Sequence, residues 1–102
     1  MIEVRFVNCY EIRMGSPYNV CDIELNGTWV PRLPTRTWQD KCAQSPDGRY
    51  LALVYWDVSN NVPGFHTVVL DTVAHTVSEN ERIKGCCDDL WWDANGLRWK
   101  VF

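Results

Sequence analysis

The sequence lacks several features that mark common functional classes. It has no run of lysine and arginine and a formal net charge of −3, so the basic surface that binds nucleic acid is missing. No stretch approaches the roughly 18 uncharged apolar residues of a membrane-spanning helix. The N-terminal residues alternate charged and apolar side chains, unlike a signal peptide. We therefore expect a cytoplasmic protein that binds neither nucleic acid nor membranes.

Patterns for metal binding and catalysis are also missing. The chain has no CxxC pair, and its two histidines, His66 and His75, do not have zinc-site spacing. Asp88, Asp89 and Asp93 lack the alternation of a calcium-binding EF-hand loop. There is no nucleophile elbow, phosphate-binding glycine loop or HExxH segment. We expect no metal, no cofactor and no catalytic residue, and we keep an enzyme based on cysteine and histidine as an alternative.

The five cysteines are Cys9, Cys21, Cys42, Cys86 and Cys87. Their odd number, together with the missing secretion signal, predicts reduced thiols that are mostly buried as small apolar side chains. The adjacent pair at 86 and 87 could act as a redox or metal-sensing site. However, the two aspartates that follow raise a thiol pKa and reduce the reactive thiolate fraction. We therefore favour a structural role in which one of the two side chains faces the core.

Aromatic residues are the most unusual part of the composition. The chain has six Trp, four Tyr and three Phe, with 46% apolar and 23% charged residues, which is typical of one folded domain over residues 1–102. An aromatic core explains most of these rings. Five tryptophans are candidates for a partner or ligand surface, because Trp combines apolar area with a polar N–H. They are Trp29, Trp38, Trp56, Trp91 and Trp92.

Strand patterns dominate the chain, and no amphipathic helix is convincing. Residues 50–56 are apolar on both faces, which predicts a central strand buried on both sides. Asn26-Gly27 is a strong hairpin signal and predicts a return strand that begins at residues 28–30. A short helical turn is expected near residues 37–42. The other expected strands cover residues 2–6, 21–25, 65–70, 75–77 and 97–102, with tight turns at 45–48, 71–74 and 93–96.

A weak internal repeat appears at an offset of 48 residues, where the turn Ser45–Gly48 overlays Asp93–Gly96. A four-stranded unit of about 40 to 50 residues has the size of a propeller blade. The segment AQSPDGRYLA, residues 43–52, resembles the strand–turn–strand of WD40-like and TolB-type β-propeller repeats, and residues 68–77 resemble the next hairpin. The resemblance is best over residues 38–77. It implies two blade-like units, at approximately 1–44 and 45–102.

Two blades cannot close a propeller ring, which needs about four or more. The two sheets could instead pack as a sandwich, associate with further copies of the chain, or cover their edges with another protein. We expect an all-β fold of roughly seven to nine short strands in two small antiparallel, blade-like sheets. The expected function is a non-catalytic module that binds itself, as a dimer or larger oligomer, or another protein. The alternative binding function is a small ligand, such as a carbohydrate, on a Trp-rich surface.

Overall fold

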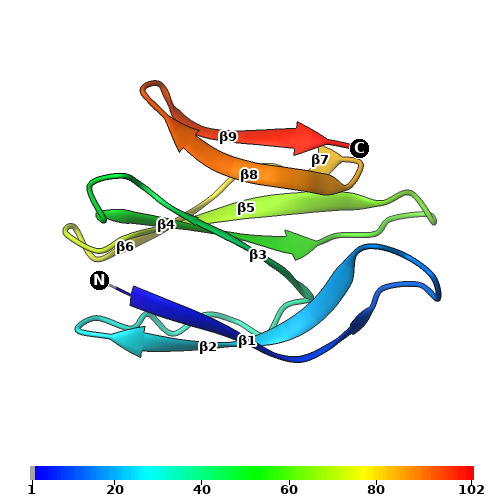
Figure 1. Cartoon of the computed structure of the whole chain (residues 1–102), viewed down its shortest axis with the longest axis horizontal. Helices are drawn as coiled ribbons and strands as arrows, with labels where there is room; N and C mark the ends of the chain where they lie inside the picture. The colour runs from blue at the N-terminus through cyan, green and yellow to red at the C-terminus, as the bar shows by residue number, and fades with distance from the viewer. Residues whose placement is uncertain (1) are drawn as a thin grey trace.

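The computed structural model describes residues 2–102 and shows an all-β fold, with nine strands and no helix in that part of the chain (Figure 1). No segment among these residues is therefore a helix that could cross a membrane. The strands are β1 (Ile2–Glu11), β2 (Asn19–Gly27), β3 (Trp38–Gln44), β4 (Tyr50–Trp56), β5 (Gly64–Asp71), β6 (Thr76–Glu79), β7 (Ile83–Lys84), β8 (Cys87–Asp93) and β9 (Gly96–Val101).

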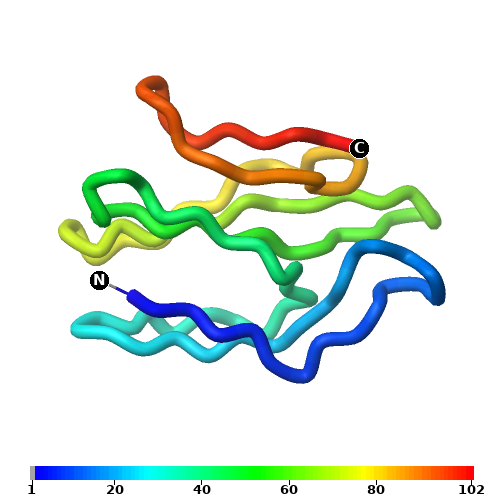
Figure 2. The backbone as a smooth tube through the Cα atoms, viewed as in Figure 1, coloured from blue at the N-terminus to red at the C-terminus, as the bar shows by residue number. Residues whose placement is uncertain are grey.

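The strands form two antiparallel sheets. Strands β1 to β6 follow one another in chain order in the larger sheet, with β7 beside β5, and β8 pairs only with β9. A single residue pair, Cys21 with Trp38, joins β2 to β3. The β1–β2 hairpin can therefore turn away from the rest of its sheet, and Figures 1 and 2 show it below β3–β5, with the β8–β9 hairpin above. The result is three layers.

The middle layer has a core on each face, and both cores use β4. On one face, a buried cluster packs against side chains of the β1–β2 hairpin and the 28–37 segment; it consists of Ile2, Trp38, Leu51, Leu53, Tyr55, Val68 and Leu70. On the other face, a second cluster meets the β8–β9 hairpin; it consists of Ala52, Val54, Phe65, Cys87 and Leu90. Every residue from Leu51 to Trp56 is buried, which confirms the prediction of a strand covered on both sides.

The expected all-β fold of seven to nine strands in two antiparallel sheets is confirmed, but two local predictions are wrong. Residues 28–37, after Asn26-Gly27, form an irregular connection and not a return strand, because β2 pairs with the preceding β1. The region near residues 37–42 is part of β3 and not a helical turn. Pairing of β3 with β4 also runs across residue 44, so the large sheet continues through the approximate boundary between the two blade-like units.

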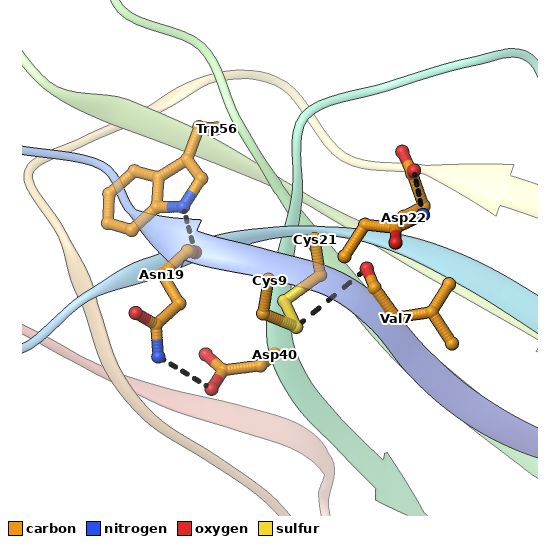
Figure 3. The surroundings of a disulfide bond; sticks show 8 residues. Val7, Cys9, Asn19, Cys21, Asp22, Asp40 and Trp56 are labelled. Atoms are coloured by element: carbon orange, nitrogen blue, oxygen red, sulfur yellow. Dashed lines mark hydrogen bonds between the residues drawn. A yellow bond between two sulfur atoms is a disulfide. The ribbon is translucent and has the colours of Figure 1, made fainter.

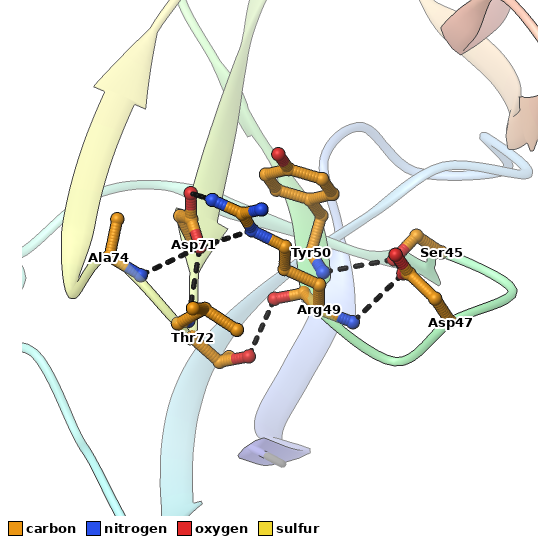
Figure 4. A network of polar contacts seen from close by, with 8 residues as sticks. Ser45, Asp47, Arg49, Tyr50, Asp71, Thr72 and Ala74 are labelled. Atoms are coloured by element: carbon orange, nitrogen blue, oxygen red, sulfur yellow. Dashed lines mark hydrogen bonds and ion pairs between the residues drawn. The ribbon is translucent and has the colours of Figure 1, made fainter.

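All three predicted tight turns are present, and side chains stabilise them. Asp47 accepts hydrogen bonds from the Ser45 hydroxyl (2.6 Å) and the Arg49 amide (3.0 Å). The Arg49 guanidinium then donates two hydrogen bonds of 2.9 Å to the carboxylate of Asp71 (Figure 4). This paired contact joins the β3–β4 turn to the β5–β6 turn at one end of the middle layer.

The prediction that all cysteines are reduced is wrong for Cys9 and Cys21, which form a disulfide (Figure 3). The physical reason is an irregularity in the β1–β2 register between Val7 and Tyr10. Asn8 has a positive φ of 53°, which places Cys9 across from Cys21. Neither the bulge nor the pairing of β1 with β2 is apparent from the cysteine count.

Candidate functional site: an aromatic cleft at one end of the sheets

Three segments that are distant in sequence converge at one end of the molecule, on the right in Figures 1 and 2. They are the β1–β2 loop, the β4–β5 loop and the last residues of the described chain. They enclose a cleft of about 410 Å³, within the usual range for small-ligand sites. Its lining is mostly apolar and consists of Ile12, Arg13, Ser16, Tyr18, Trp56, Val58, Pro63, Cys86 and Phe102.

Three aromatic rings form the wall of this aromatic cleft. The rings of Tyr18 and Trp56 meet edge to face with centroids 5.6 Å apart, and the Tyr18 and Phe102 centroids are 6.5 Å apart. The Tyr18 hydroxyl donates to Asp88 Oδ1 (3.2 Å), and the indole Nε1–H of Trp56 donates to the Asn19 carbonyl (3.0 Å). Because their polar atoms already have partners, a ligand need not break these hydrogen bonds. Trp56 is 4% exposed and closes the inner end of the cleft, whereas Tyr18 is half-buried and leaves part of its ring open.

The β4–β5 loop forms another wall, and Arg82 holds it in place. The guanidinium of Arg82 donates to the carbonyl oxygens of Asp57 (3.0 Å) and Val62 (2.7 Å), near the two ends of the loop. It passes directly over Gly64, where a methyl group would overlap it. The glycine at the start of β5 therefore permits the contact that fixes Val58 and Pro63 beside the cleft.

His66 supports the same loop from β5. Its Nε2 lies 2.7 Å from Asp57 Oδ2, and its Nδ1 lies 2.9 Å from the carbonyl oxygen of Asn80. Burial lowers the pKa of His66, but the hydrogen bonds to Asn80 and Asp57 and the nearby negative charges together raise the pKa above its ordinary value. His66 and His75 are not neighbours: His66 pairs with Tyr55 on β4, whereas His75 stacks on Trp29.

The unpaired cysteines have pKa values that disfavour the thiolate. Burial raises the pKa of Cys87 to about 11, and partial desolvation of the thiol raises the pKa of Cys86 and Cys42. Cys87 is fully buried against β4, as expected for a core thiol, whereas Cys42 is exposed and departs from that expectation. Cys86 lines the aromatic cleft, so its thiol contributes a polarisable apolar surface there.

The structure does not gather the five predicted tryptophans on one surface. Trp38 is buried in the core between the middle layer and the β1–β2 hairpin, and Trp29 stacks on His75. Trp92 is half-buried, stacks on Tyr50 and donates its indole N–H to the Ala43 carbonyl. Trp91 is exposed on the outer face of the β8–β9 hairpin. Of the five, only Trp56 lines the aromatic cleft.

Sequence reasoning missed most of the cleft, including Tyr18, Phe102 and Arg13. No local motif surrounds these residues, and they come from opposite ends of the chain. The sequence feature that could have indicated the cleft is the pair of loops beside its aromatic residues. Ser16-Pro17 precedes Tyr18, and the asparagine-rich segment 57–64 follows Trp56. Loops at one end of a β-sheet structure commonly form its binding site.

Within residues 2–102, no group of three or more histidine, cysteine or acidic side chains is placed to hold a metal ion. No protein family, curated protein or solved structure matches this chain.

Proposed function

We propose that this protein is a non-catalytic binding module and that the aromatic cleft is its binding site. The observation that carries the proposal is the convergence of Tyr18, Trp56 and Phe102 around about 410 Å³ of mostly apolar space. The hydrogen bonds of Tyr18 and Trp56, and the clamp of Arg82 on the β4–β5 loop, hold the walls in position before a ligand arrives. A site that is already ordered loses less entropy on binding.

Exposed apolar side chains around the cleft support the same proposal. Met14, at the tip of the β1–β2 loop, is 100% exposed, and Phe102 is 83% exposed. Val58 is also exposed at the rim. Exposed apolar residues that cluster beside a cleft are typical of a binding surface, whereas single ones are common on any protein. The occupant is an apolar group, either a small molecule or a side chain of a partner protein.

The test is nuclear magnetic resonance titration with 3-phenylpropanol, an uncharged aromatic probe. A fragment of this size binds with an affinity on the order of millimolar. The expected shifts are in the indole N–H signal of Trp56 and the amides of residues 12–18 and 57–63. Phe102→Ala should weaken binding, and Tyr10→Ala should leave it unchanged, because Tyr10 is exposed but does not line the cleft. Absence of shifts at the cleft would overturn the proposal.

Two further predictions accompany this proposal. Self-association is a prediction that light scattering on a sizing column tests, and the exposed edge strand β6 is one place where a second copy could pair.

The carbohydrate alternative rests on the exposed ring of Trp91, and a sugar that shifts the Trp91 indole signal and leaves the Trp56 signal in place would favour it. The resemblance to propeller repeats does not decide between these functions.

A further inference from the structure

We propose that the aromatic cleft selects ligands in which an apolar body carries a carboxylate, with the guanidinium of Arg13 as the group that binds the carboxylate. This inference rests on the proposed binding function and adds the chemical class of the ligand.

The first step is the position of Arg13 at the cleft. The residue lines the cleft from the β1–β2 loop, and Cys86 lines the same cleft from the segment before β8. The positive charge of Arg13 is close enough to lower the pKa of Cys86, against the larger raising effect of burial. Arg13 and Cys86 therefore line the same cleft and lie close enough for their charges to interact.

The second step is that Arg13 has no counter-charge. Among residues 2–102, its side chain takes part in no ion pair and no side-chain hydrogen bond. Arginine presents five N–H donors in a planar arrangement that matches the two oxygens of a carboxylate. These donors are available to a ligand.

The third step is that the acids at this end already have partners. Asp88 accepts the Tyr18 hydroxyl at 3.2 Å and lies 3.8 Å from Lys100 Nζ. The Glu11 carboxylate, on the β1–β2 hairpin, accepts the amide of Gly15 at 2.7 Å. Asp57 is held by His66 at 2.7 Å. Because these acids keep their own donors and none pairs with Arg13, its guanidinium stays available to a ligand carboxylate.

The fourth step is the contrast between the apolar side chains of the cleft and the single positive charge of Arg13. The rings and the aliphatic side chains of Ile12, Val58 and Pro63 favour an apolar body, and Ser16 adds one hydroxyl. An uncharged apolar ligand would fill the cleft but leave Arg13 unpaired. A ligand with a carboxylate at one end would satisfy both parts of the site. Because the arginine is exposed, its contribution should depend on salt.

The experiment compares three probes of the same length: 3-phenylpropanoate, 3-phenylpropanol and 3-phenylpropylammonium. Affinities are taken from the Trp56 indole shift at about 20 mM and 500 mM salt. At low salt the carboxylate should bind about three- to tenfold more tightly than the alcohol, and the ammonium more weakly. High salt should reduce the difference.

Arg13→Gln should bring the affinities of the carboxylate and the alcohol close together, and Arg13→Lys should retain part of the preference for the carboxylate. Arg32→Gln is the matched control, because Arg32 is an exposed arginine that does not line the cleft, and it should behave as the unmodified protein. Equal binding of all three probes, or a carboxylate preference that survives in Arg13→Gln, overturns this inference and leaves the proposed function standing. If no probe shifts the cleft signals, the proposed function fails and the inference fails with it.

Discussion

His66 Nε2 lies 2.7 Å from Asp57 Oδ2, and this pair joins β5 to the loop that forms one wall of the aromatic cleft. The other ring nitrogen, Nδ1, faces the carbonyl oxygen of Asn80 at 2.9 Å. A neutral imidazole has one N–H and can donate to only one of these acceptors, whereas the imidazolium donates to both. The surroundings also include the stacked ring of Tyr55, the Arg82 guanidinium and the carboxylate of Glu79.

This arrangement predicts a stability that depends on pH through His66. Burial alone lowers the pKa of His66, but its hydrogen-bond acceptors raise it above the unfolded value of about 6.5. The contribution is therefore fully present below that unfolded value and is lost as pH rises through the higher folded value. Urea unfolding of the protein and of His66→Gln should differ more at pH 5.5 than at pH 8.5. His75→Asn, which changes the other histidine, should retain the pH dependence; equal profiles for the protein and His66→Gln would refute the role of His66.

The Cys9–Cys21 disulfide should stabilise the β1–β2 hairpin. It closes a loop with a sequence separation of 12 residues, and chain-entropy arguments give about 3 kcal/mol for a loop of this size. Cys9→Ser should therefore lower the free energy of unfolding by about 3 kcal/mol. The exposed Cys42→Ser is the control and should change it by less than about 0.5 kcal/mol.

Dithiothreitol should reproduce the effect of Cys9→Ser in the unmodified protein and add nothing in the variant. The same measurement bears on the cytoplasmic expectation, since disulfides are rare in reducing compartments. If mass spectrometry of the purified, non-reduced protein found all five cysteines free, the bond and its predicted stabilisation would both be refuted.

The sequence predicts strand β4 and the tight turns well because the patterns there are local. Leu51 to Trp56 are continuously apolar, and the turns at 45–48 and 93–96 have their own side-chain hydrogen bonds, such as Asp93 Oδ1 to the amide of Asn95 at 2.7 Å. Such signals do not depend on distant parts of the chain. They are sufficient for the all-β fold and for most of the strand positions.

The cleft and the disulfide could not be predicted because both depend on which strands pair. Asn26-Gly27 is a strong hairpin signal, yet Gly27 ends β2 opposite Ile2. Once β2 pairs with β1, the register brings Cys9 to Cys21. The contact between Tyr18 and Phe102 depends in turn on how the hairpin and the end of the chain pack together. A pattern read along the chain contains the preference for a strand but not the identity of its partner.

Phe65 should be a principal source of stability because it joins two layers. It is fully buried between β4 and the β8–β9 hairpin. Phe65→Ala should lower the free energy of unfolding by about 3 to 5 kcal/mol through lost burial and the cavity that remains. Val73→Ala, at a position that is 69% exposed, should change it by less than about 0.5 kcal/mol. Similar denaturant midpoints for the two variants would show that the β8–β9 hairpin does not pack as described.

Asp71 should stabilise the protein even in acid. The Arg49 guanidinium, together with the backbone amides of Ala74 and Val73, holds the pKa of Asp71 well below its ordinary range (Figure 4). A lowered folded pKa gives a contribution that is present above the unfolded value and is lost only as pH falls through the folded value. Asp71→Asn should therefore melt at a lower temperature than the unmodified protein at both pH 7 and pH 4. Glu81 is an exposed acid outside this contact, so Glu81→Gln should melt at the same temperature as the unmodified protein. The prediction is contradicted if Asp71→Asn and the unmodified protein melt at the same temperature at pH 4.

Gly64 and Arg82 should be coupled, since the guanidinium occupies the space that a side chain at position 64 would need. Gly64→Ala should displace Arg82 from the carbonyl oxygens of Asp57 and Val62, destabilise the protein by about 1 to 3 kcal/mol and weaken probe binding in the cleft. Arg82→Ala loses the same hydrogen bonds directly. If steric displacement is the cause, the double variant Gly64→Ala/Arg82→Ala should be no less stable than Arg82→Ala alone. If the free energies of unfolding lost in the two single variants instead add up in the double variant, Gly64 is required for another reason, such as its backbone conformation, and not for the space that the Arg82 guanidinium fills.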